Sequence, residues 1–589
     1  MEFGKFRQVI GKILEAELPK GKAVIDEGRS ISGQIRIGRT AFMDRMGVSS
    51  EAEYKRACMK EGRVMFHAHI GMSSWAATSR ALAYIHSVAE ESGFVIDRAG
   101  LCLDRRMALP EKLRHTVRAE TGPMLEGEAD WKNLAQVAPI QPHMGDFMIG
   151  FPGSTENTVQ ALKVGITTVG NLSQFFSHEV PYWNDQATTT AETVKAIALM
   201  GAFRDRGTLV HSYLEDGYGA LFQDCCTVAG WALLERHIVE NLIGAKLTHC
   251  NGGLTSDPVK RAGWIFALDE IHEHDCVGSM FYGDTISFTE DFNINRGLIA
   301  EYITWDVLAQ LECPTGHAVL PLPVTEAVRV PSGEEIAEAH VFGRRVEQLA
   351  RRLRPHVSFE APKTFARTIV DNGRKVCENA LSGLEEAGVD TKDPVELLYV
   401  LKKMKPGLFE EMFGVGPADG SAESGHCPIV PTDVFHSWKN EEEKIMFFFR
   451  APAHRKLLQG KKILIASTDV HEHALFLIRR VLSDADVGAE VIDLGAEVDP
   501  DEIAREAIEN SADAVMISTH NGMALEYCKE FKVEMLHRDL SVPIFVGGVL
   551  NQKFEEQEMP VDVTDEIARM GFHPCIRLQD MIKVLEGSF

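Results

Sequence analysis

The sequence predicts an α/β protein with an N-terminal (β/α)8 TIM-type barrel and a C-terminal flavodoxin-like, doubly wound domain. The chain has 589 residues, which is more than one hydrophobic core usually organises. Short apolar segments alternate with helical stretches along most of that length. A small, polar, glycine-rich segment at residues 414–425 interrupts the alternation and is typical of a loop or linker. We therefore expect separate folded parts on either side of it.

The C-terminal part has the more regular alternation. Its second helix begins with Asp499, Pro500 and Glu502, a capping-box arrangement with proline at the first helical position. Because its strands are mostly apolar, we expect a parallel sheet with helices on both faces and a ligand beyond the carboxyl ends of the strands. Strands are predicted at 462–467, 490–494, 514–517, 543–546 and near Cys575. Helices are predicted at 474–483 and 579–585; a further helix begins at Pro500, and another follows the third strand and ends at about His537.

The N-terminal part alternates in the same way over a greater length, and seven or eight such units fit a (β/α)8 barrel. Strands are predicted at 64–66, 147–150, 167–169, 208–211, 246–248, 277–281 and 318–320, and helices at 191–200 and 229–241. The whole chain is then divided into a helical extension (1–60), the catalytic barrel (61–413), a linker with a charged helix around 439–448 (414–459), and the C-terminal domain (460–589).

Composition narrows the range of partners. The formal net charge is −25, and an acidic surface repels phosphate backbones, so we expect neither nucleic acid nor an anionic membrane as a partner. No apolar run approaches the roughly 20 residues that span a bilayer, and the N-terminus has no signal-peptide core. The eleven cysteines include no Cys-x-x-Cys pair, which indicates reduced thiols. We expect a cytoplasmic homo-oligomer, a dimer, that acts on a small molecule.

One motif after the first C-terminal strand carries specific chemistry. Asp469-Val470-His471-Glu472-His473-Ala474 resembles the Asp-x-His-x-x-Gly signature of cobalamin-binding domains. In that family the histidine displaces the cofactor's own base and ligates cobalt from below, and the aspartate fixes the tautomer of the histidine through its far nitrogen. The resemblance implies that Asp469 and His471 bind the cofactor and that His471 is the cobalt ligand. The alternative is a surface loop rich in Asp and His.

Two further positions match that family. Ser518 follows the third strand where the family has Ser-x-Leu, and Gly547-Gly548 follows the fourth strand where the family has Gly-Gly beside the nucleotide tail. The resemblance implies that Ser518, Gly547 and Gly548 line the cofactor. Ala474 stands where the family has glycine and His520 where it has leucine, so we expect a shifted tail.

Most of residues 60–435 resemble the catalytic subunit of glutamate mutase, an adenosylcobalamin-dependent carbon-skeleton isomerase. The resemblance is carried by residues 171–182, which read Asn-Leu-Ser-Gln-Phe-Phe-Ser-His-Glu-Val-Pro-Tyr, by 316–327, and by the turn at 150–153. Glutamate mutase divides the barrel and the cobalamin domain between two chains, whereas here they are fused. The resemblance implies adenosylcobalamin as cofactor and a radical rearrangement as the reaction.

The family's substrate ligands are only partly present. Tyr182 is kept, and Arg105 or Arg106 corresponds to one of the arginines that bind the substrate. The family's remaining ligands align with other residue types here: its ammonium-binding glutamate with Leu172, a tyrosine with His178, an arginine near His69, and the ribose-binding lysine and glutamate with Pro314 and Ala318. The substrate is therefore predicted to be small, polar and carboxylated, but not glutamate. Asn251, Asp284 and Glu326 are the candidates for holding the ribose instead.

The residues themselves offer candidates at predicted strand ends, where barrel enzymes place their chemistry. His69 belongs to a His67-Ala68-His69 motif that also resembles the zinc-binding pair of metal-dependent hydrolases. Arg105 can bind a carboxylate in a bidentate manner or pair locally at a helix start. His178 and Glu215 complete the predicted catalytic set with Tyr182. Further candidates at strand ends are His143, His211, His249, Asp216, Asp284 and Glu290.

These features together predict an adenosylcobalamin-dependent radical isomerase. The alternative is a corrinoid-dependent methyltransferase, a class that usually carries a small helical cap before the Asp-x-His sheet. A non-catalytic cobalamin sensor is a third possibility, but a sensor does not need a whole barrel with polar strand ends.

Overall fold

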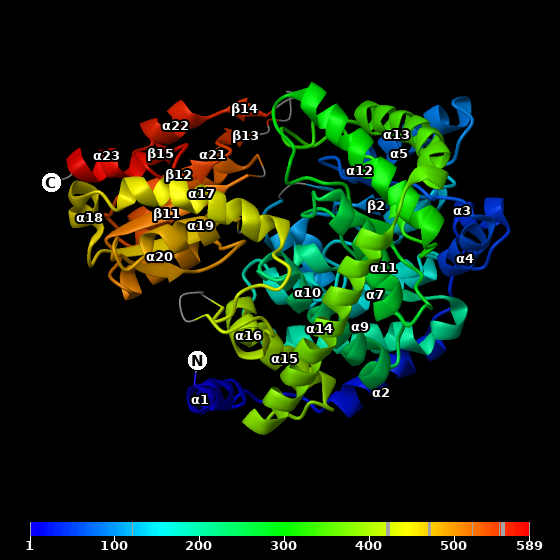
Figure 1. The fold of residues 1–589 in the computed structure, drawn as a ribbon, viewed down its shortest axis with the longest axis horizontal. Coiled ribbons are helices and arrows are strands. Elements are labelled where there is room, and N and C mark those ends of the chain that lie inside the picture. The colour runs from blue at the N-terminus through cyan, green and yellow to red at the C-terminus, as the bar shows by residue number, and fades with distance from the viewer. Residues whose placement is uncertain are drawn as a thin grey trace. The chain divides into compact units, whose positions relative to one another are not determined.

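The computed structural model describes residues 2–119, 122–419, 424–468, 473–520, 522–552, 554 and 560–587. These form two compact units (Figure 1). The N-terminal unit comprises Met1–Val180 and Asn184–Val434, and the C-terminal unit comprises Pro181–Trp183 and Phe435–Phe589. Among the described residues, no helix is both long and apolar enough to cross a membrane.

The N-terminal unit is built on eight parallel strands. The paired sets are β1-β2-β3, β4-β5-β6 and β7-β8. Parallel bridges between Phe66 and Val319 and between Met144 and Val169 join these sets, so neighbouring strands follow the chain from β7 and β8 through β1 to β6. The strands are β1 His67–Ile70, β2 Arg98–Leu101, β3 Gln141–His143, β4 Thr168–Gly170, β5 Leu209–Tyr213, β6 Leu247–Cys250, β7 Met280–Phe281 and β8 Ala318–Val319.

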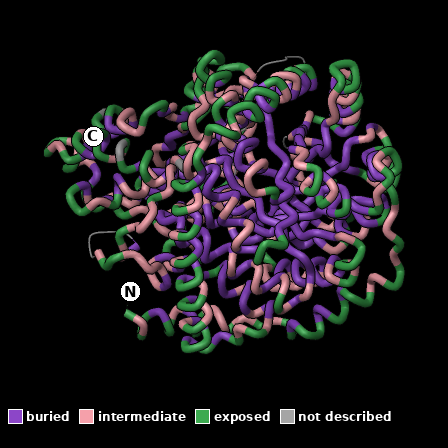
Figure 2. Tube along the Cα trace, turned by 45° about the vertical axis from the view of Figure 1, so that its right-hand side comes forward, coloured by how far each residue is buried: buried purple, intermediate pink, exposed green. Residues whose placement is uncertain are grey.

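Helices connect successive strands and cover them, so the strands are buried while the exposed residues lie mainly on the helices (Figure 2). Several helix starts are fixed by side-chain caps, such as Asp257 before Pro258 and the Ser332–Glu335 capping box. The connecting helices are α5 Trp75–Glu91, α6 Glu128–Gln136, α7 Ser154–Lys163, α8 Gln174–Ser177, α9 Gln186–Ala202, α10 Cys225–Arg236 with the π-helix His237–Ile243, α11 Pro258–Ile271 and α12 Phe292–Glu312.

Further helices flank this series at both ends. They are α1 Phe3–Ile13, α2 Gly21–Ile31, α3 Ala41–Met46 and α4 Glu51–Glu61 before β1, and α13 Gly333–Leu353, α14 Glu360–Ala387, α15 Pro394–Met404 and α16 Pro406–Phe413 after β8. Short 3-10 helices lie at Ser32–Gln34, Arg105–Ala108, Glu111–Thr116, Arg204–Arg206, Leu214–Asp216, Tyr218–Ala220 and Arg354–His356.

The predicted N-terminal strands overlap the observed strands β4 to β8, but the predictions for the region of β2 and β3 fail. The predicted strand at 147–150 is wrong, because this apolar segment forms a buried turn in which the Phe147 N–H donates to Gln174 Oε1 at 2.9 Å. Strands β2 and β3 were not predicted. The predicted segment 64–66 lies directly before β1, and the predicted helices fall within α9 and along α10 with its π-helical extension.

The C-terminal unit contains the predicted five-stranded parallel sheet. Its strand order is β10-β9-β11-β12-β15, which is the flavodoxin-like order 2-1-3-4-5. The strands are β9 Lys462–Ser467, β10 Glu490–Asp493, β11 Ala514–Thr519, β12 Ile544–Gly548 and β15 His573–Cys575. The helices are α17 Asp433–Phe449, α18 Pro452–Leu458, α19 His473–Leu482, α20 Pro500–Glu509, α21 Ala524–His537, α22 Thr564–Arg569 and α23 Asp580–Gly587.

Apolar side chains cover both faces of this sheet, because residues of one strand point alternately to two hydrophobic clusters. Leu464, Val515 and Ile517 belong to one cluster, and Ile463, Ile465 and Met516 to the other. A small antiparallel pair, β13 Asn551–Gln552 and β14 Val561–Asp562, and helix α22 were not predicted. The capping box at Asp499 is wrong in detail. Asp499 precedes α20, but its side chain makes no capping bond and instead accepts the Tyr182 N–H at 3.1 Å.

Candidate functional site

The carboxyl ends of β11 and β12 form an edge with bare backbone and unpartnered hydroxyls. Ser518 pairs with Gly547 and Thr519 with Gly548 in the parallel ladder. The hydroxyls of Ser518 and Thr519 are buried and have no hydrogen-bond partner within the described part of the chain. Gly548 has a φ of +94°, and a Cβ there would lie 2.3 Å from the Thr519 carbonyl oxygen. This edge therefore admits no side chain at Gly548 and leaves two polar atoms for a ligand.

Asp469 and His471, the predicted aspartate–histidine pair, lie outside the described residues. The elements on either side are in place, since β9 ends at Ser467 and α19 begins at His473. Ser467, the last residue of β9, lies at the carboxyl end of the sheet, which is the edge where a ligand of such a sheet binds.

Buried imidazoles line the strands of the N-terminal unit. His67, His143 and His211 are each at most 1% exposed, and neighbouring rings have centroids 5.9 and 4.5 Å apart. Burial, and then the charge of Arg98, holds the pKa of each of these histidines well below its usual range. Gly100 makes room for them, because a Cβ there would lie 2.6 Å from His67 Nε2. These rings are neutral at physiological pH.

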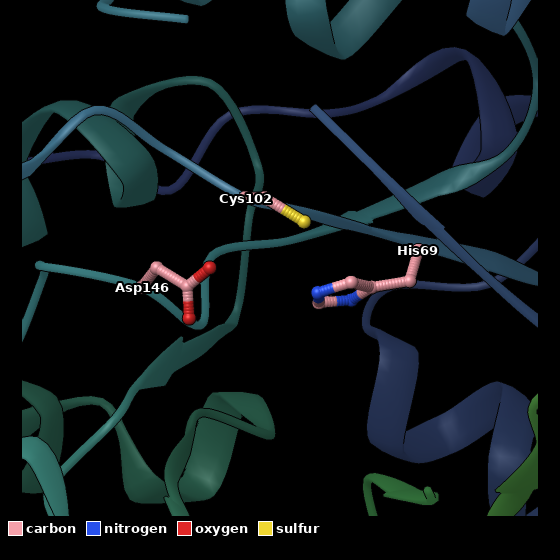
Figure 3. A group of neighbouring side chains, drawn as sticks. All are labelled: His69, Cys102 and Asp146. Carbon is pink, nitrogen blue, oxygen red and sulfur yellow. The ribbon is translucent and has the colours of Figure 1, made fainter. Parts of the chain in front are cut away.

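A second group lies further toward the carboxyl ends of the first three strands. His69, Cys102 and Asp146 point toward one another, and one ligand atom from each lies within 4.8 Å of the others (Figure 3). Burial lowers the pKa of His69 to about 4. Burial, and then the carboxylate of Asp146, holds the pKa of the Cys102 thiol well above its usual range. We call these three residues the strand-end cluster.

Acidic and phenolic groups surround the strand-end cluster. The ring of His69 meets the ring of Tyr282 edge-on at 5.4 Å, and Tyr282 stacks on Tyr213 at 5.1 Å. Burial, followed by repulsion from Asp216, raises the pKa of Asp146 to about 8, and burial raises the pKa of Glu326 to about 7. A protonated Asp146 donates a hydrogen bond at neutral pH, so this region can bind a carboxylate without an arginine.

The other predicted catalytic residues occupy different positions. His178 is 4% exposed, and its Nδ1 lies 2.9 Å from Ser177 Oγ and its Nε2 3.9 Å from Asp216. Arg105 is buried in the short helix after β2, where Asp104 forms an ion pair with the neighbouring Arg106. Tyr182 is 62% exposed and groups with the C-terminal unit. At the start of the short helix Arg105–Ala108, the local ion pair is therefore made by Arg106.

Glu215 orders a loop. Its carboxylate accepts the Gly252 N–H at 2.6 Å, the Leu254 N–H at 3.2 Å and the Thr255 hydroxyl at 2.7 Å. Burial raises the pKa of Glu215, and these donors counteract part of that effect. The loop also carries Asn251, whose side-chain amide is fully buried, lacks a partner among the described residues and lines a small pocket with Glu215. Of this pair, Asn251 is the residue whose polar side-chain atoms are left for a ligand.

Sequence reasoning missed Cys102, Asp146, Tyr213 and Tyr282. Each follows or ends a strand, so correct assignment of β2 and β3 from residues 98–101 and 141–143 would have indicated Cys102 and Asp146. His249 was a candidate, but it bonds to His272 at 2.9 Å and to Glu235 at 3.2 Å; Glu235 lies in α10, and His272 directly follows α11. His249 therefore points away from the strand-end cluster.

The fold and its open edge define the C-terminal unit as a doubly wound α/β ligand-binding domain. Residues 463–569 match the family described as B12 binding domain, so the chain carries a cobalamin-binding domain. Among solved structures, the chain is similar to a novel cobalamin-binding protein from Desulfitobacterium hafniense DCB-2, at 14% identity over 51% of this chain and 100% of that one. The TM-score is 0.19, which is too low to carry an argument. No curated protein matches the chain.

The residues at the sheet edge fit this cofactor. A flat, bulky ligand tail that slides against backbone requires glycine where Gly547 and Gly548 stand, and the buried hydroxyls of Ser518 and Thr519 are donors for its polar atoms. Ser518, Gly547 and Gly548 are therefore the described residues that would hold cobalamin, with Asp469 and His471 as the predicted pair at the metal.

Proposed function

We propose that the N-terminal unit is a closed (β/α)8 barrel. Seven of the eight neighbouring strand pairs are joined by ladders or bridges. The eighth junction carries a hydrogen bond from the Tyr282 N–H, after β7, to the Asn251 carbonyl, after β6, at 2.9 Å. Eight parallel strands with helical connections close in this way, and the carboxyl ends then form the catalytic face. The strand-end cluster lies on that face.

We propose further that the protein is an adenosylcobalamin-dependent radical isomerase acting on a small polar, carboxylated substrate other than glutamate. The observation that carries the proposal is the presence, in one chain, of a B12-binding domain and a half-buried polar cluster at the ends of parallel strands. When bound, the cofactor supplies hydrogen-atom abstraction from an unactivated carbon. A small-molecule substrate and a homodimer remain predictions from the sequence.

The protein's own residues bind the substrate, orient it and exclude water in this scheme. Asp146, with its pKa raised to about 8, donates a hydrogen bond to a substrate carboxylate or carbonyl. Neutral His69, beside Tyr282, accepts or donates a proton at a bound hydroxyl or amine. Leu172, at 0% exposure, offers no carboxylate for an ammonium group, which is the reason for excluding glutamate.

The decisive experiment compares cofactor forms with the full chain. The isomerase proposal predicts turnover of carboxylated candidates with adenosylcobalamin but not with methylcobalamin, and deuterium transfer from the migrating position of the substrate to 5′-deoxyadenosine. Glutamate should give no 3-methylaspartate. If methylcobalamin alone supports a reaction and a methylated product accumulates, the corrinoid methyltransferase takes the place of the isomerase.

The methyltransferase alternative has less structural support. In the C-terminal unit the helices that directly precede β9 are α17 and α18, whose residues Ile445, Phe449 and Leu458 pack into one face of the sheet. These helices therefore complete the hydrophobic core of the sheet. A cap that guards a methyl group needs helices that cover the ligand edge instead.

A further inference from the structure

Three consecutive strand ends bring three metal-binding side chains together. His69 lies in β1, Cys102 directly follows β2, and Asp146 comes three residues after β3. Because β1, β2 and β3 are parallel neighbours, their carboxyl ends meet at one edge. Figure 3 shows the imidazole, the thiol and the carboxyl group converging on one point from these three segments.

We propose that His69, Cys102 and Asp146 bind one zinc ion. Imidazole nitrogen, thiolate sulfur and carboxylate oxygen are the three donor types that zinc takes in proteins, and a site with three protein ligands keeps a fourth position open. The inference rests only on the described N-terminal residues and needs no cobalamin. With the ion bound, His69 and Asp146 are metal ligands, and a substrate carboxylate meets the ion instead of a protonated Asp146. It also differs from a hydrolase-type His67–His69 pair, since only His69 takes part.

The geometry is close to what zinc requires. Ligand atoms around a tetrahedral zinc ion lie about 3.3–3.7 Å apart, given bonds of about 2.0–2.3 Å. The atoms of the three residues lie within 4.8 Å of one another, so the widest pair must close by at most about 1 Å, which is within the reach of side-chain rotation. Deeper in the protein, His67 and His143 are fully buried and lack hydrogen-bond partners among the described residues, but neither belongs to the group whose ligand atoms lie within 4.8 Å of one another.

The surroundings hold one of the ligands, Asp146, in position. Asp146 Oδ1 accepts a hydrogen bond from Gln174 Nε2 at 3.3 Å. Gln174 is itself fixed, because its Nε2 donates to Asp216 at 2.9 Å and its Oε1 accepts the Phe147 N–H at 2.9 Å. Such outer partners orient metal-binding carboxylates. On the other side, His69 Nδ1 is buried and has no hydrogen-bond partner in the described part of the chain.

The charge balance favours a divalent ion. A thiolate and a carboxylate this close together repel each other, and an ion of charge +2 neutralises both. On binding, the Cys102 thiol and any protonated Asp146 lose their protons to solvent, and His69 binds as the neutral imidazole. The open fourth position takes an oxygen of water or of an oxygen-bearing substrate, and the ion polarises whatever occupies it.

The test measures zinc in the full chain, prepared without cobalamin, after loading with zinc and dialysis against a weak chelator. We expect about one zinc per chain by elemental analysis. His69→Ala, Cys102→Ala and Asp146→Asn should each lose at least about tenfold in affinity, because losing even an outer partner of a metal ligand costs about 10- to 100-fold. Asp146→Asn keeps the volume of the side chain and so tests the site where a truncation fails to fold. Cobalt(II) in place of zinc should give a thiolate-to-metal charge-transfer band that Cys102→Ala abolishes.

Cys377→Ala is the matched control, because Cys377 is also a partly buried cysteine of the N-terminal unit. This variant should bind zinc as the unchanged chain does, and circular dichroism should confirm that all variants are folded. The inference is overturned if the folded chain retains no zinc, or if it retains equal zinc in the Cys102 and Asp146 variants. Neither result depends on turnover, so failure here leaves the isomerase proposal standing.

Discussion

Replacing Gly548 by alanine tests the ligand edge of the C-terminal sheet. Gly548 has a φ of +94°, and the added Cβ would lie 2.3 Å from the Thr519 carbonyl oxygen. That oxygen also accepts the Val549 N–H at 2.8 Å. Left-handed backbone costs alanine about 1 kcal/mol, and the shift of about 1 Å that relieves the contact costs the Val549 hydrogen bond, about 1 kcal/mol more. We expect Gly548→Ala to lower the free energy of unfolding by about 2 kcal/mol in total.

Gly460→Ala separates backbone strain from contact. Gly460 has a φ of +75°, but a Cβ there meets nothing within 4 Å, so this variant should lose about 1 kcal/mol and keep its cobalamin affinity. Gly548→Ala should in addition bind cobalamin at least about tenfold more weakly. A tenfold loss corresponds to about 1.4 kcal/mol of binding free energy, which is less than the expected strain at this position. Hydrogen exchange of β11 and β12 measures the stability, and spectral titration measures the affinity. Unchanged cobalamin affinity in Gly548→Ala would refute the assignment of this edge to the cofactor.

Three further predictions concern single residues. His471→Ala should abolish the histidine nitrogen splitting in the electron paramagnetic resonance spectrum of bound cob(II)alamin and weaken binding, whereas an unchanged spectrum would remove His471 as the lower ligand. Glu215→Gln should destabilise the protein by about 1–3 kcal/mol and raise hydrogen exchange at residues 252–255, because the carboxylate holds that loop; unchanged exchange would contradict this role. His340 is fully buried, and burial lowers its pKa from 6.5 to about 3, so stability is lost as pH falls below 6.5. His340→Leu should therefore gain about 2 kcal/mol relative to the unchanged chain between pH 7 and pH 5, measured by denaturant unfolding at both values.

The C-terminal sheet could be predicted from the sequence because most of its strands are uninterrupted apolar segments. Both faces of the sheet are covered, so β9, β11 and β12 are continuous apolar runs, and strand boundaries fall within a few residues of the predicted ones. The B12-binding match over residues 463–569 agrees with the cofactor inferred from the motif. The pair β13–β14 escaped prediction because two-residue strands carry no periodic signal.

The N-terminal strands were harder to predict because their inward faces are polar. β2 begins with Arg98 and β3 contains Gln141 and His143, so neither has the apolar pattern of a buried strand. The apolar segment 147–150 looked like a strand but is a turn buried by tertiary packing. The same polarity hid the strand-end cluster: His69 was predicted, while Cys102 and Asp146 follow the two strands that were missed.

In the N-terminal unit, the polar residues at the amino ends of the strands differ from those at the carboxyl ends in how their charges are balanced. At the amino ends of the strands, Glu51 lies 3.0 Å from Arg98 and 3.4 Å from Lys55, and Lys55 Nζ donates to the Ser279 carbonyl at 2.7 Å. Opposite charges meet there, as expected of a structural network. At the carboxyl ends, Cys102 and Asp146 are both acids whose pKa values are raised by burial and then by a nearby carboxylate, that of Asp146 for Cys102 and that of Asp216 for Asp146. Groups held away from their preferred charge state mark functional sites more often than structural ones. The strand-end cluster is therefore the part of this unit in which to look for chemistry.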